Sequence, residues 1–333
     1  MPNQEKKKIT TDIKIFAIVS IVIALIITAA IIYIGKPKDI VTVQNNRVNS
    51  DEFRFYYTQN LSNYSQYMSY FSTEQEYLSY IKEQTLQQVI EIQILLLDAK
   101  KDGFKVDTKE INDIWKQMEQ DIRENASMSG LSVRDFSKQA LGTNLSKLKG
   151  IYNNYIIYQK YIEHKVNEMP VDDEELTAYY EENKESFDYN TVRHILILCE
   201  RDAEDDVVAE KSKMAQDVLD KVNNGDDFDT LALEYSEDTG SQNTGGVYEV
   251  TQTSDYVPEF KEWTFTHKAG DTGIVRTDHG FHVMRLDNIY DSLEAQKEYI
   301  QMALRYNKFQ TYMNESLNSE EYKVDVKDEY NQF

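Results

Sequence analysis

Cysteine, proline and glycine are scarce in this sequence, and the scarcity of each excludes or favours particular structural features. Cys199 is the only cysteine among 333 residues, which excludes an internal disulfide and a thiolate metal cluster. It lies in an apolar run, a setting typical of a buried structural thiol. The four prolines and 12 glycines are few, as expected of a chain in which long helices dominate.

Positive charge is also in short supply. The chain has 36 lysines and arginines against 58 acidic residues, a formal net charge of -22. Because an acidic chain repels a phosphate backbone, this balance disfavours a nucleic-acid partner. The apolar fraction of 41% is ordinary and the charges are spread along the chain, which predicts globular folding rather than disorder. At this length, two folded units with accessory segments are expected.

One long hydrophobic run is present, near the N-terminus. Residues 15–35 carry almost only apolar or small side chains, and about 20 such residues can span a bilayer. Lysines within residues 1–14 should keep that tail cytoplasmic. A cleaved signal peptide is the alternative, but the run is long for one and lacks a good cleavage site. We therefore expect an uncleaved transmembrane signal anchor, with the bulk of the chain on the extracytoplasmic face of the cell membrane.

Residues 40–187 show the pattern of a helical lobe. A short β-type run from Ile40 turns near Asn46, and helical patterns follow it, the strongest of them over residues 77–99. Residue pairs suited to N-capping precede these patterns. The pairs are Asn49/Glu52, Thr73/Glu76, Asp107/Glu110, Ser132/Asp135 and Asp172/Glu175.

Tyrosine and methionine crowd the segment from Tyr64 to Phe71, which includes Tyr67, Met68 and Tyr70. Side chains of this kind form a core at helical spacing, or they offer promiscuous apolar contacts to a partner. We expect core packing here and keep the partner-binding interpretation as the alternative.

Two segments follow the central part of the chain. Residues 291–317 form a helical pattern whose apolar side chains are Ile300, Leu304, Phe309 and Met313. Packing back on the first helical lobe is the simplest way to bury that face. Residues 318–333 are an acidic tail that we expect to be loosely held, although part of it, residues 322–326, can form a short strand.

Residues 188–289 alternate between strand and helix patterns. An apolar strand contains His194, and a second strand contains His279 and His282. Between the two strands lie a helix over about residues 203–223, a short helix, a turn-rich loop, a short strand and a helix near 257–264. This pattern predicts a small α+β domain with four strands.

Several motifs in this region agree in order and spacing with one family. They are His194-Ile195-Leu196-Ile197, the run from Gly225 to Asp238, Gly240-Ser241, Gly245-Gly246, Phe260, Gly270 and the run from Thr277 to His282. Together they resemble the parvulin-type peptidyl-prolyl isomerase domain. The flanking residues 43–53 and 171–187 resemble the helical chaperone parts of PrsA/SurA-like extracytoplasmic foldases. The resemblance implies an α+β domain with a four-stranded antiparallel sheet, inserted between helices of an all-α chaperone lobe.

The resemblance also implies a site and a reaction. It places the catalytic residues at His194, Asp238, Thr277 and His282, and the substrate-binding residues at Tyr256, Phe260, Phe281 and Val247. The implied reaction is cis/trans isomerisation of X-Pro peptide bonds, whose uncatalysed barrier is about 18–20 kcal/mol. It requires no covalent step, metal or other cofactor.

Other interpretations of these residues are weaker. Either histidine alone is better interpreted as a core residue with its hydrogen bonds satisfied. Only the joint match of both histidines with Asp238 and Thr277 favours a catalytic site. His279 and His282 lack a third metal ligand at a convincing spacing. The loop at residues 200–206 is acidic, which disfavours phosphopeptide substrates.

Two functions remain open at this point. The first is a membrane-anchored extracytoplasmic foldase that isomerises X-Pro bonds and assists folding of translocated proteins. The second is a non-catalytic holdase chaperone or assembly scaffold with an inactive isomerase domain, because residues 247–250 depart from the family pattern. The expected partners are unfolded or partly folded secreted proteins with X-Pro bonds, and the membrane through residues 15–35. A homodimer through the helical lobe is left open.

Overall fold

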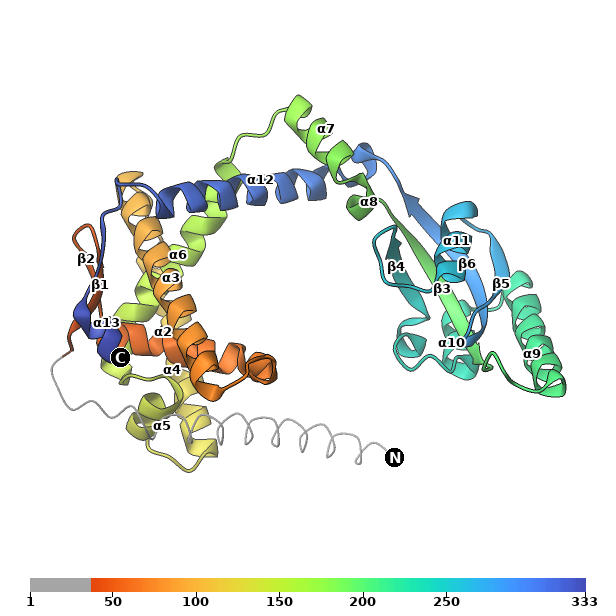
Figure 1. The fold of residues 1–333 in the computed structure, drawn as a ribbon, viewed down its shortest axis with the longest axis horizontal. Helices are drawn as coiled ribbons and strands as arrows, with labels where there is room; N and C mark the ends of the chain where they lie inside the picture. The colour runs from red at the N-terminus through yellow and green to blue at the C-terminus, as the bar shows by residue number, and fades with distance from the viewer. Residues whose placement is uncertain (1–36) are drawn as a thin grey trace. The chain divides into compact units, whose positions relative to one another are not determined.

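The computed structural model describes residues 37–333, which divide into two compact units (Figure 1). The first unit contains residues 37–169 together with Asn307–Phe333, and the second contains Pro170–Tyr306. The anchor predicted at residues 15–35 and the tail at residues 1–14 lie outside the described residues. Within residues 37–333, no helix combines the length and the apolarity needed to cross a bilayer.

The first unit is mainly helical. Its helices are α2 (Ser50–Asn63), η1 (Ser65–Tyr70), α3 (Glu74–Lys101), α4 (Thr108–Met128), α5 (Val133–Ala140) and α6 (Leu145–Glu168). Side chains expected to be caps do begin these helices. The Asn49 side chain accepts the backbone N–H groups of Asp51 and Glu52, and Thr73 accepts that of Glu76. Such caps satisfy donors that have no partner within the helix.

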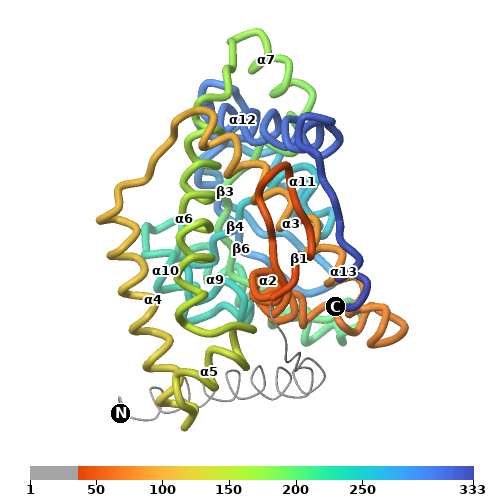
Figure 2. Tube along the Cα trace, turned by 90° about the vertical axis from the view of Figure 1, so that its left-hand side faces the viewer, coloured from red at the N-terminus to blue at the C-terminus, as the bar shows by residue number. Residues whose placement is uncertain are grey.

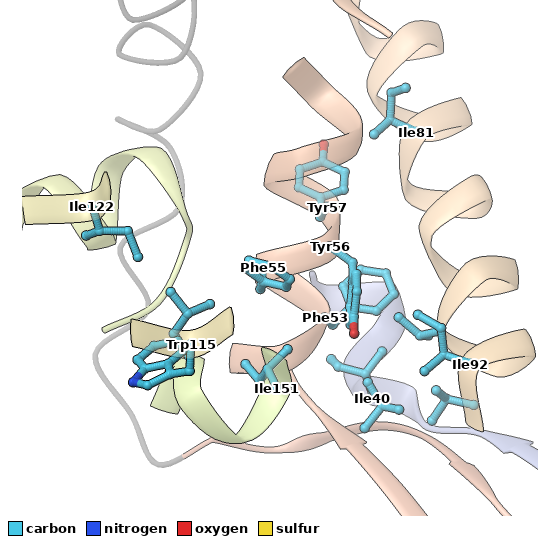
Figure 3. Packing of buried hydrophobic residues seen from close by; sticks show 14 of the residues in the cluster. Ile40, Phe53, Phe55, Tyr56, Tyr57, Ile81, Ile92, Trp115, Ile122 and Ile151 are labelled. Carbon is cyan, nitrogen blue, oxygen red and sulfur yellow. The ribbon is translucent and has the colours of Figure 1, made fainter. Parts of the chain in front are cut away.

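The apolar faces of α2, α3 and α6 meet in one core (Figure 3). Phe53, Ile81 and Ile92 are fully buried, and Tyr56 is only 2% exposed. Burying side chains of this size contributes about 1.5–3 kcal/mol each. α3 and α6 lie side by side in both views of the chain (Figures 1 and 2). The core therefore depends on helices that are distant in sequence.

The C-terminal segment belongs to this unit, so the expectation of a loosely held tail is wrong. Strand β7 (Val324–Val326) pairs antiparallel with β1 (Asp39–Val43), which also pairs with β2 (Asn46–Asn49). Figure 2 shows the dark blue chain running past β1 to the short helix α13 (Asp328–Gln332). The short strand that the sequence allowed is therefore present.

Buried aromatic side chains explain why the acidic tail is held. Tyr322 is 6% exposed, and the ring of Phe333 lies 4.7 Å from that of Phe53. The buried Asp98 carboxylate accepts hydrogen bonds from the hydroxyls of Tyr312 and Tyr322. The acidic composition of the tail does not reveal these contacts. Its acidic side chains stay in water, while its aromatic side chains are buried.

The segment from Tyr64 to Phe71 is a surface feature, so core packing was a wrong expectation for most of it. Tyr67 is 45% exposed, Met68 38% and Tyr70 83%. η1 is a 3₁₀-helix, in which residues three apart eclipse one another. The rings of Tyr64, Tyr67 and Tyr70 therefore form a row, with successive centroids 6.2 Å apart. We call these residues the tyrosine row.

The second unit contains the predicted four-stranded antiparallel sheet, which is confirmed. Its strands are β3 (Tyr189–Leu198), β4 (Val247–Thr251), β5 (Thr272–Arg276) and β6 (Gly280–Tyr290), in the order β4-β3-β6-β5. Helices α9 (Asp205–Asn223) and α10 (Phe228–Tyr235) pack on one face, and α11 (Pro258–Thr266) packs on the other. Figure 1 shows these helices around the sheet.

Alternation along the strands separates the two faces. Ile195, Ile197 and Val283 pack toward α9 and α10, together with Cys199, which is buried as predicted. Side chains one residue out of step, such as Met284, pack toward α11. A strand turns successive side chains to opposite faces, so residue parity decides which face each side chain joins.

Three further helices complete the second unit. α7 (Asp173–Glu182) and α8 (Lys184–Phe187) pack through Leu176 and Phe187 on the first part of α12 (Leu293–Leu317), at Ile300 and Leu304. The sequence pattern instead predicts boundaries at 187/188 and near 290, with the whole of α12 packed on the helical lobe.

The apolar stripe of α12 explains this difference. Leu304 and Phe309 are five residues apart, so the stripe rotates by roughly 140° between them instead of continuing on one face. Phe309 and Met313 accordingly join the core of the first unit, while Ile300 and Leu304 join that of the second.

Candidate active site

Two histidines on neighbouring strands form the centre of the site. His194 lies on β3 and His282 on β6, and both side chains point to the face covered by α11. Their rings stack with centroids 5.2 Å apart, and the two Nδ1 atoms are 3.0 Å apart. His194 is 4% exposed and His282 5%, so water cannot satisfy these nitrogens.

A carboxylate and a hydroxyl extend the pair at its two ends. Nε2 of His194 lies 3.0 Å from Oδ2 of Asp238, in the loop after α10. At the other end, Nε2 of His282 lies 2.8 Å from Oγ1 of Thr277, just after β5. Thr277 also accepts the backbone N–H of His279. We call Thr277, His282, His194 and Asp238 the histidine network.

The Asp238 carboxylate is held in its charged form. Burial alone would raise its pKa, but hydrogen bonds from Ser241, Tyr248, His194 and the backbone N–H of Gly240 lower the pKa to about 2. Three of these donors share Oδ2, and Gly240 binds Oδ1 at 3.1 Å. An ionised carboxylate can only accept, so His194 must donate from Nε2.

Both histidines are neutral near pH 7. Burial lowers the pKa of His194, and the bond to Asp238 offsets only part of that effect. Burial and the neighbouring His194 hold the pKa of His282 well below its ordinary value. A neutral imidazole carries one N–H, so the direction of every bond in the network follows from Asp238.

The histidine network therefore runs in one direction. His194 donates from Nε2 to Asp238, which leaves its Nδ1 free to accept from Nδ1 of His282. Nε2 of His282 then accepts the hydroxyl proton of Thr277. No donor is left over among these four side chains. The arrangement is rigid and uncharged except at Asp238.

Aromatic side chains form an apolar cluster beside the network. The ring of Phe260 on α11 lies 5.4 Å from that of His194 and 5.6 Å from that of His282. Tyr256 stacks on Phe260 at 5.6 Å, and Tyr248 meets Tyr256 edge-on at 5.4 Å. We call Phe260, Tyr256 and Tyr248 the aromatic slot. Phe260 is 3% exposed, whereas Tyr256 and Tyr248 are partly exposed, so the two tyrosines supply the surface that a ligand can reach.

Two expected substrate-binding residues are not brought to this face. Phe281 packs with the α9 side of the sheet, where the Arg276 guanidinium lies 4.6 Å from its ring. Val247 pairs with Arg193 in the β3–β4 ladder, one residue out of step with Tyr248. Because side chains alternate along a strand, both residues face away from the histidines.

Ser241 and Tyr248 join the site although they were not expected there. Ser241 is 2% exposed and donates to Asp238. The Tyr248 hydroxyl donates to the same carboxylate oxygen at 2.9 Å. The sequence offered a signal, since residue 248 departs from the family pattern. Only the pairing of Val192 with Tyr248 shows where the phenol points.

The loops that carry these side chains are tied to β3. Ser236 Oγ accepts the backbone N–H groups of Leu196 and Asp238, which fixes the start of the Asp238 loop. Gly246 has φ +71°, and a Cβ there would lie 2.1 Å from the His194 carbonyl oxygen. A glycine is therefore required for the loop to lie against the strand.

This site suits bond rotation rather than bond cleavage. Every polar group of the histidine network is committed to a neighbour, so none is poised as a nucleophile. In the part of the chain that the structure describes, no three His, Cys, Asp or Glu side chains are grouped to hold a metal. An apolar aromatic surface next to a fixed polar network can instead contact a proline ring while its peptide bond twists.

Comparison with known families gives two matches. Residues 177–291 match the PPIC-type PPIase domain, and residues 4–143 match the SurA-like N-terminal domain. The first match contains every residue of the histidine network and of the aromatic slot.

Two foldases and one solved structure illustrate what the chain is similar to. Foldase protein PrsA from Caldanaerobacter subterraneus is 28% identical over 215 residues, which span 64% of this chain and 59% of that protein. Foldase protein PrsA 3 from Bacillus anthracis is 30% identical over 252 residues, which span 72% of this chain and 78% of that protein. The crystal structure of PrsA from Bacillus subtilis shares 19% identity, with a TM-score of 0.34, and covers 90% of this chain and 99% of that one.

Sequence identity with the Bacillus anthracis foldase extends over more than two thirds of both chains. The PPIC-type match supplies the class of the domain that holds the site. The chain belongs to the PrsA foldase family, and residues 177–291 form a parvulin-type peptidyl-prolyl cis-trans isomerase domain.

Proposed function

We propose that the chain is a membrane-anchored extracytoplasmic foldase that catalyses cis/trans isomerisation of X-Pro bonds in translocated proteins. The second unit carries the catalysis, and the helical first unit holds unfolded segments of the client. The clients are unfolded or partly folded secreted proteins. The observation that carries the proposal is the buried histidine network beside the aromatic slot.

The chemistry of the X-Pro bond explains why such a site is suitable. Rotation breaks amide resonance, which accounts for most of a barrier of about 18–20 kcal/mol. Each reduction of about 1.4 kcal/mol speeds the rotation tenfold. The partly exposed Tyr256 ring, backed by the buried Phe260, holds the proline ring, while polar groups favour the twisted form over the planar one.

Within this proposal each network residue has a role. His194 and His282 form the floor on which the twisting bond rests, with their protons fixed by the chain of hydrogen bonds. Asp238 sets the tautomer of His194, and Thr277 sets that of His282. A change in any of the four disturbs the proton positions in the others.

The decisive experiment measures isomerisation of a proline tetrapeptide by exchange NMR. Wild type is compared with His194→Ala, His282→Ala and Asp238→Ala. We expect catalysis by wild type and a loss of roughly tenfold or more in each variant. Uncatalysed rates in all four proteins would remove the enzymatic function. The thermal transition of each variant, measured alongside, separates lost chemistry from lost folding.

The membrane anchor rests on residues 15–35. Their apolar run and the lysines before it support a single span with the N-terminus in the cytoplasm. Full-length protein should therefore sediment with membranes after alkaline carbonate washing, and protease added outside the cell membrane should digest the bulk of the chain. Release by carbonate would contradict the anchor.

A non-catalytic holdase is the second candidate, favoured by the exposed tyrosine row of the first unit. Contiguous exposed apolar side chains mark interaction sites. Under this candidate, Tyr67→Ser with Tyr70→Ser should weaken suppression of aggregation of an unfolded client, while the tetrapeptide isomerises at the uncatalysed rate with wild type and variant alike. Light scattering at several concentrations tests the alternative use of this surface, a homodimer formed through the helical units.

A further inference from the structure

The Tyr248 hydroxyl differs from the other polar groups of the site because it can be released. The N–H groups of both histidines and the hydroxyl of Thr277 are all used inside the histidine network. Those three side chains are at most 5% exposed, so they cannot turn to a substrate without leaving a buried partner unsatisfied. Tyr248 is partly exposed and lies at the wall of the aromatic slot.

Asp238 can give up the Tyr248 bond at low cost. The carboxylate keeps three other donors, from Ser241, His194 and the backbone of Gly240. Its side chain is 20% exposed, so a water molecule can replace the phenol. Tyr248 keeps its proton throughout, since burial and the hydrogen bond to Asp238 raise its pKa.

The position of the phenol suits a hydrogen-bond donor to the prolyl nitrogen during rotation. The Tyr248 ring lies 5.2 Å from that of His194, at the polar end of the slot that would hold the proline ring. In a planar amide the nitrogen lone pair is shared with the carbonyl, so the nitrogen is a poor acceptor. Twisting the bond localises that lone pair and makes the nitrogen an acceptor. A donor aimed at it stabilises the transition state and not the ground state.

We propose that Tyr248 is a further catalytic residue, whose hydroxyl turns from Asp238 to donate a hydrogen bond to the prolyl nitrogen of the twisted X-Pro bond. This inference rests on the proposed isomerase function. No bond is made or broken except the hydrogen bonds, and the phenol returns to Asp238 when the bond becomes planar.

The test uses Tyr248→Phe in the full chain, because this change removes only the hydroxyl. The matched control is Ser241→Ala, which removes a donor from the same Asp238 oxygen but leaves the slot unchanged. Exchange NMR at several concentrations of a proline tetrapeptide yields kcat and KM for wild type and both variants. Thermal unfolding checks that both variants fold.

We expect kcat to fall by roughly tenfold to a hundredfold in Tyr248→Phe, with KM within about twofold of wild type. Ser241→Ala should lose no more than about threefold in kcat, because one of four Asp238 donors is missing. Equal losses in the two variants would mean that Tyr248 only orients Asp238, which overturns the inference. A raised KM with unchanged kcat would overturn it too. An inactive wild type would instead refute the proposed function, and the inference with it.

Discussion

Thr277 shows at the residue scale how a small side chain supports a larger one. Its hydroxyl is the one donor to Nε2 of the buried His282 in the histidine network, and it also receives the backbone N–H of His279. Both partners would lose a hydrogen bond if the hydroxyl were removed. A buried group without a partner costs about 1–3 kcal/mol.

Thr277→Val should therefore lower the free energy of unfolding of the second unit by about 1–3 kcal/mol. The shape of the side chain is retained, so the loss reports the hydrogen bonds rather than packing. Urea titration followed by near-UV circular dichroism measures it. Thr277→Ser keeps the hydroxyl and should lie close to wild type; if serine were as costly as valine, the methyl group would be the stabilising feature instead.

The two neutral histidines also make stability depend on pH. In the folded state burial holds both pKa values below the ordinary 6.5, so the unfolded chain takes up protons first as the pH falls. Stability is therefore complete above about pH 7 and decreases as the pH falls through 6.5, by up to about 1.4 kcal/mol per pH unit for each histidine.

The titration of Asp238 lies outside the pH range in which the two histidines affect stability. Its pKa is lowered from 3.8 to about 2, so its stabilising contribution persists until the pH drops below about 4. The free energy of unfolding of the second unit should thus fall steadily between pH 7 and pH 4.5, and His282→Asn should reduce the slope by about half. The measurement follows the second unit alone, because burial raises the pKa of Glu52 in the first unit to about 7, which gives that unit the opposite slope. A pH-independent second unit would contradict neutral buried histidines.

At the scale of elements, the loop between α10 and β4 is shaped by one close approach. Gly246 accepts the backbone N–H of His194 and has a left-handed backbone, with no room for a Cβ. Gly225 after α9 also has a positive φ, of +91°, but a Cβ there would meet nothing within 4 Å. Comparing substitutions at the two glycines therefore separates the energetic cost of backbone strain from that of a steric clash.

Gly246→Ala should destabilise the second unit by several kcal/mol, because strain of about 1–2 kcal/mol is joined by a clash with backbone. Gly225→Ala should cost only the strain, about 1–2 kcal/mol. Thermal melts of the two variants make the comparison. Similar melting temperatures would show that the loop relaxes away from His194. In that case, the Asp238 bond and catalysis should weaken as well.

At the scale of the whole molecule, the C-terminal segment holds the first unit together. β7 pairs with β1, and Tyr322 and Tyr312 both donate to the buried Asp98 of α3. Phe333 contacts Phe53 and Tyr57 of α2. The last residues of the chain thus close the unit that its first described residues begin.

Deletion of residues 319–333 should lower the unfolding temperature of the first unit and leave that of the second unchanged, because the lost contacts all lie in the first. Differential scanning calorimetry of the full chain should show the two transitions separately. Isomerase activity on a tetrapeptide provides the control and should be retained. A single shifted transition would mean that the two units unfold together.

Local sequence patterns determined much of both units. The starts of α2, α3 and α7 follow from capping residues, and the order of strands and helices in the second unit follows from periodicity. These features depend on residues that are near one another in the chain, so the sequence carries them directly. The resemblance to a family supplied His194 and His282 as the centre of the site and Asp238 and Thr277 as their partners.

Only the tertiary structure decided which side chains share a face. Strand register and parity brought Tyr248 to Asp238 and turned Val247 and Phe281 away from the histidines. Packing between distant segments buried the acidic tail, while it left the tyrosine row exposed. Each of these outcomes depends on pairing between residues far apart in sequence. A one-residue change of register reverses the face, and no local pattern encodes it.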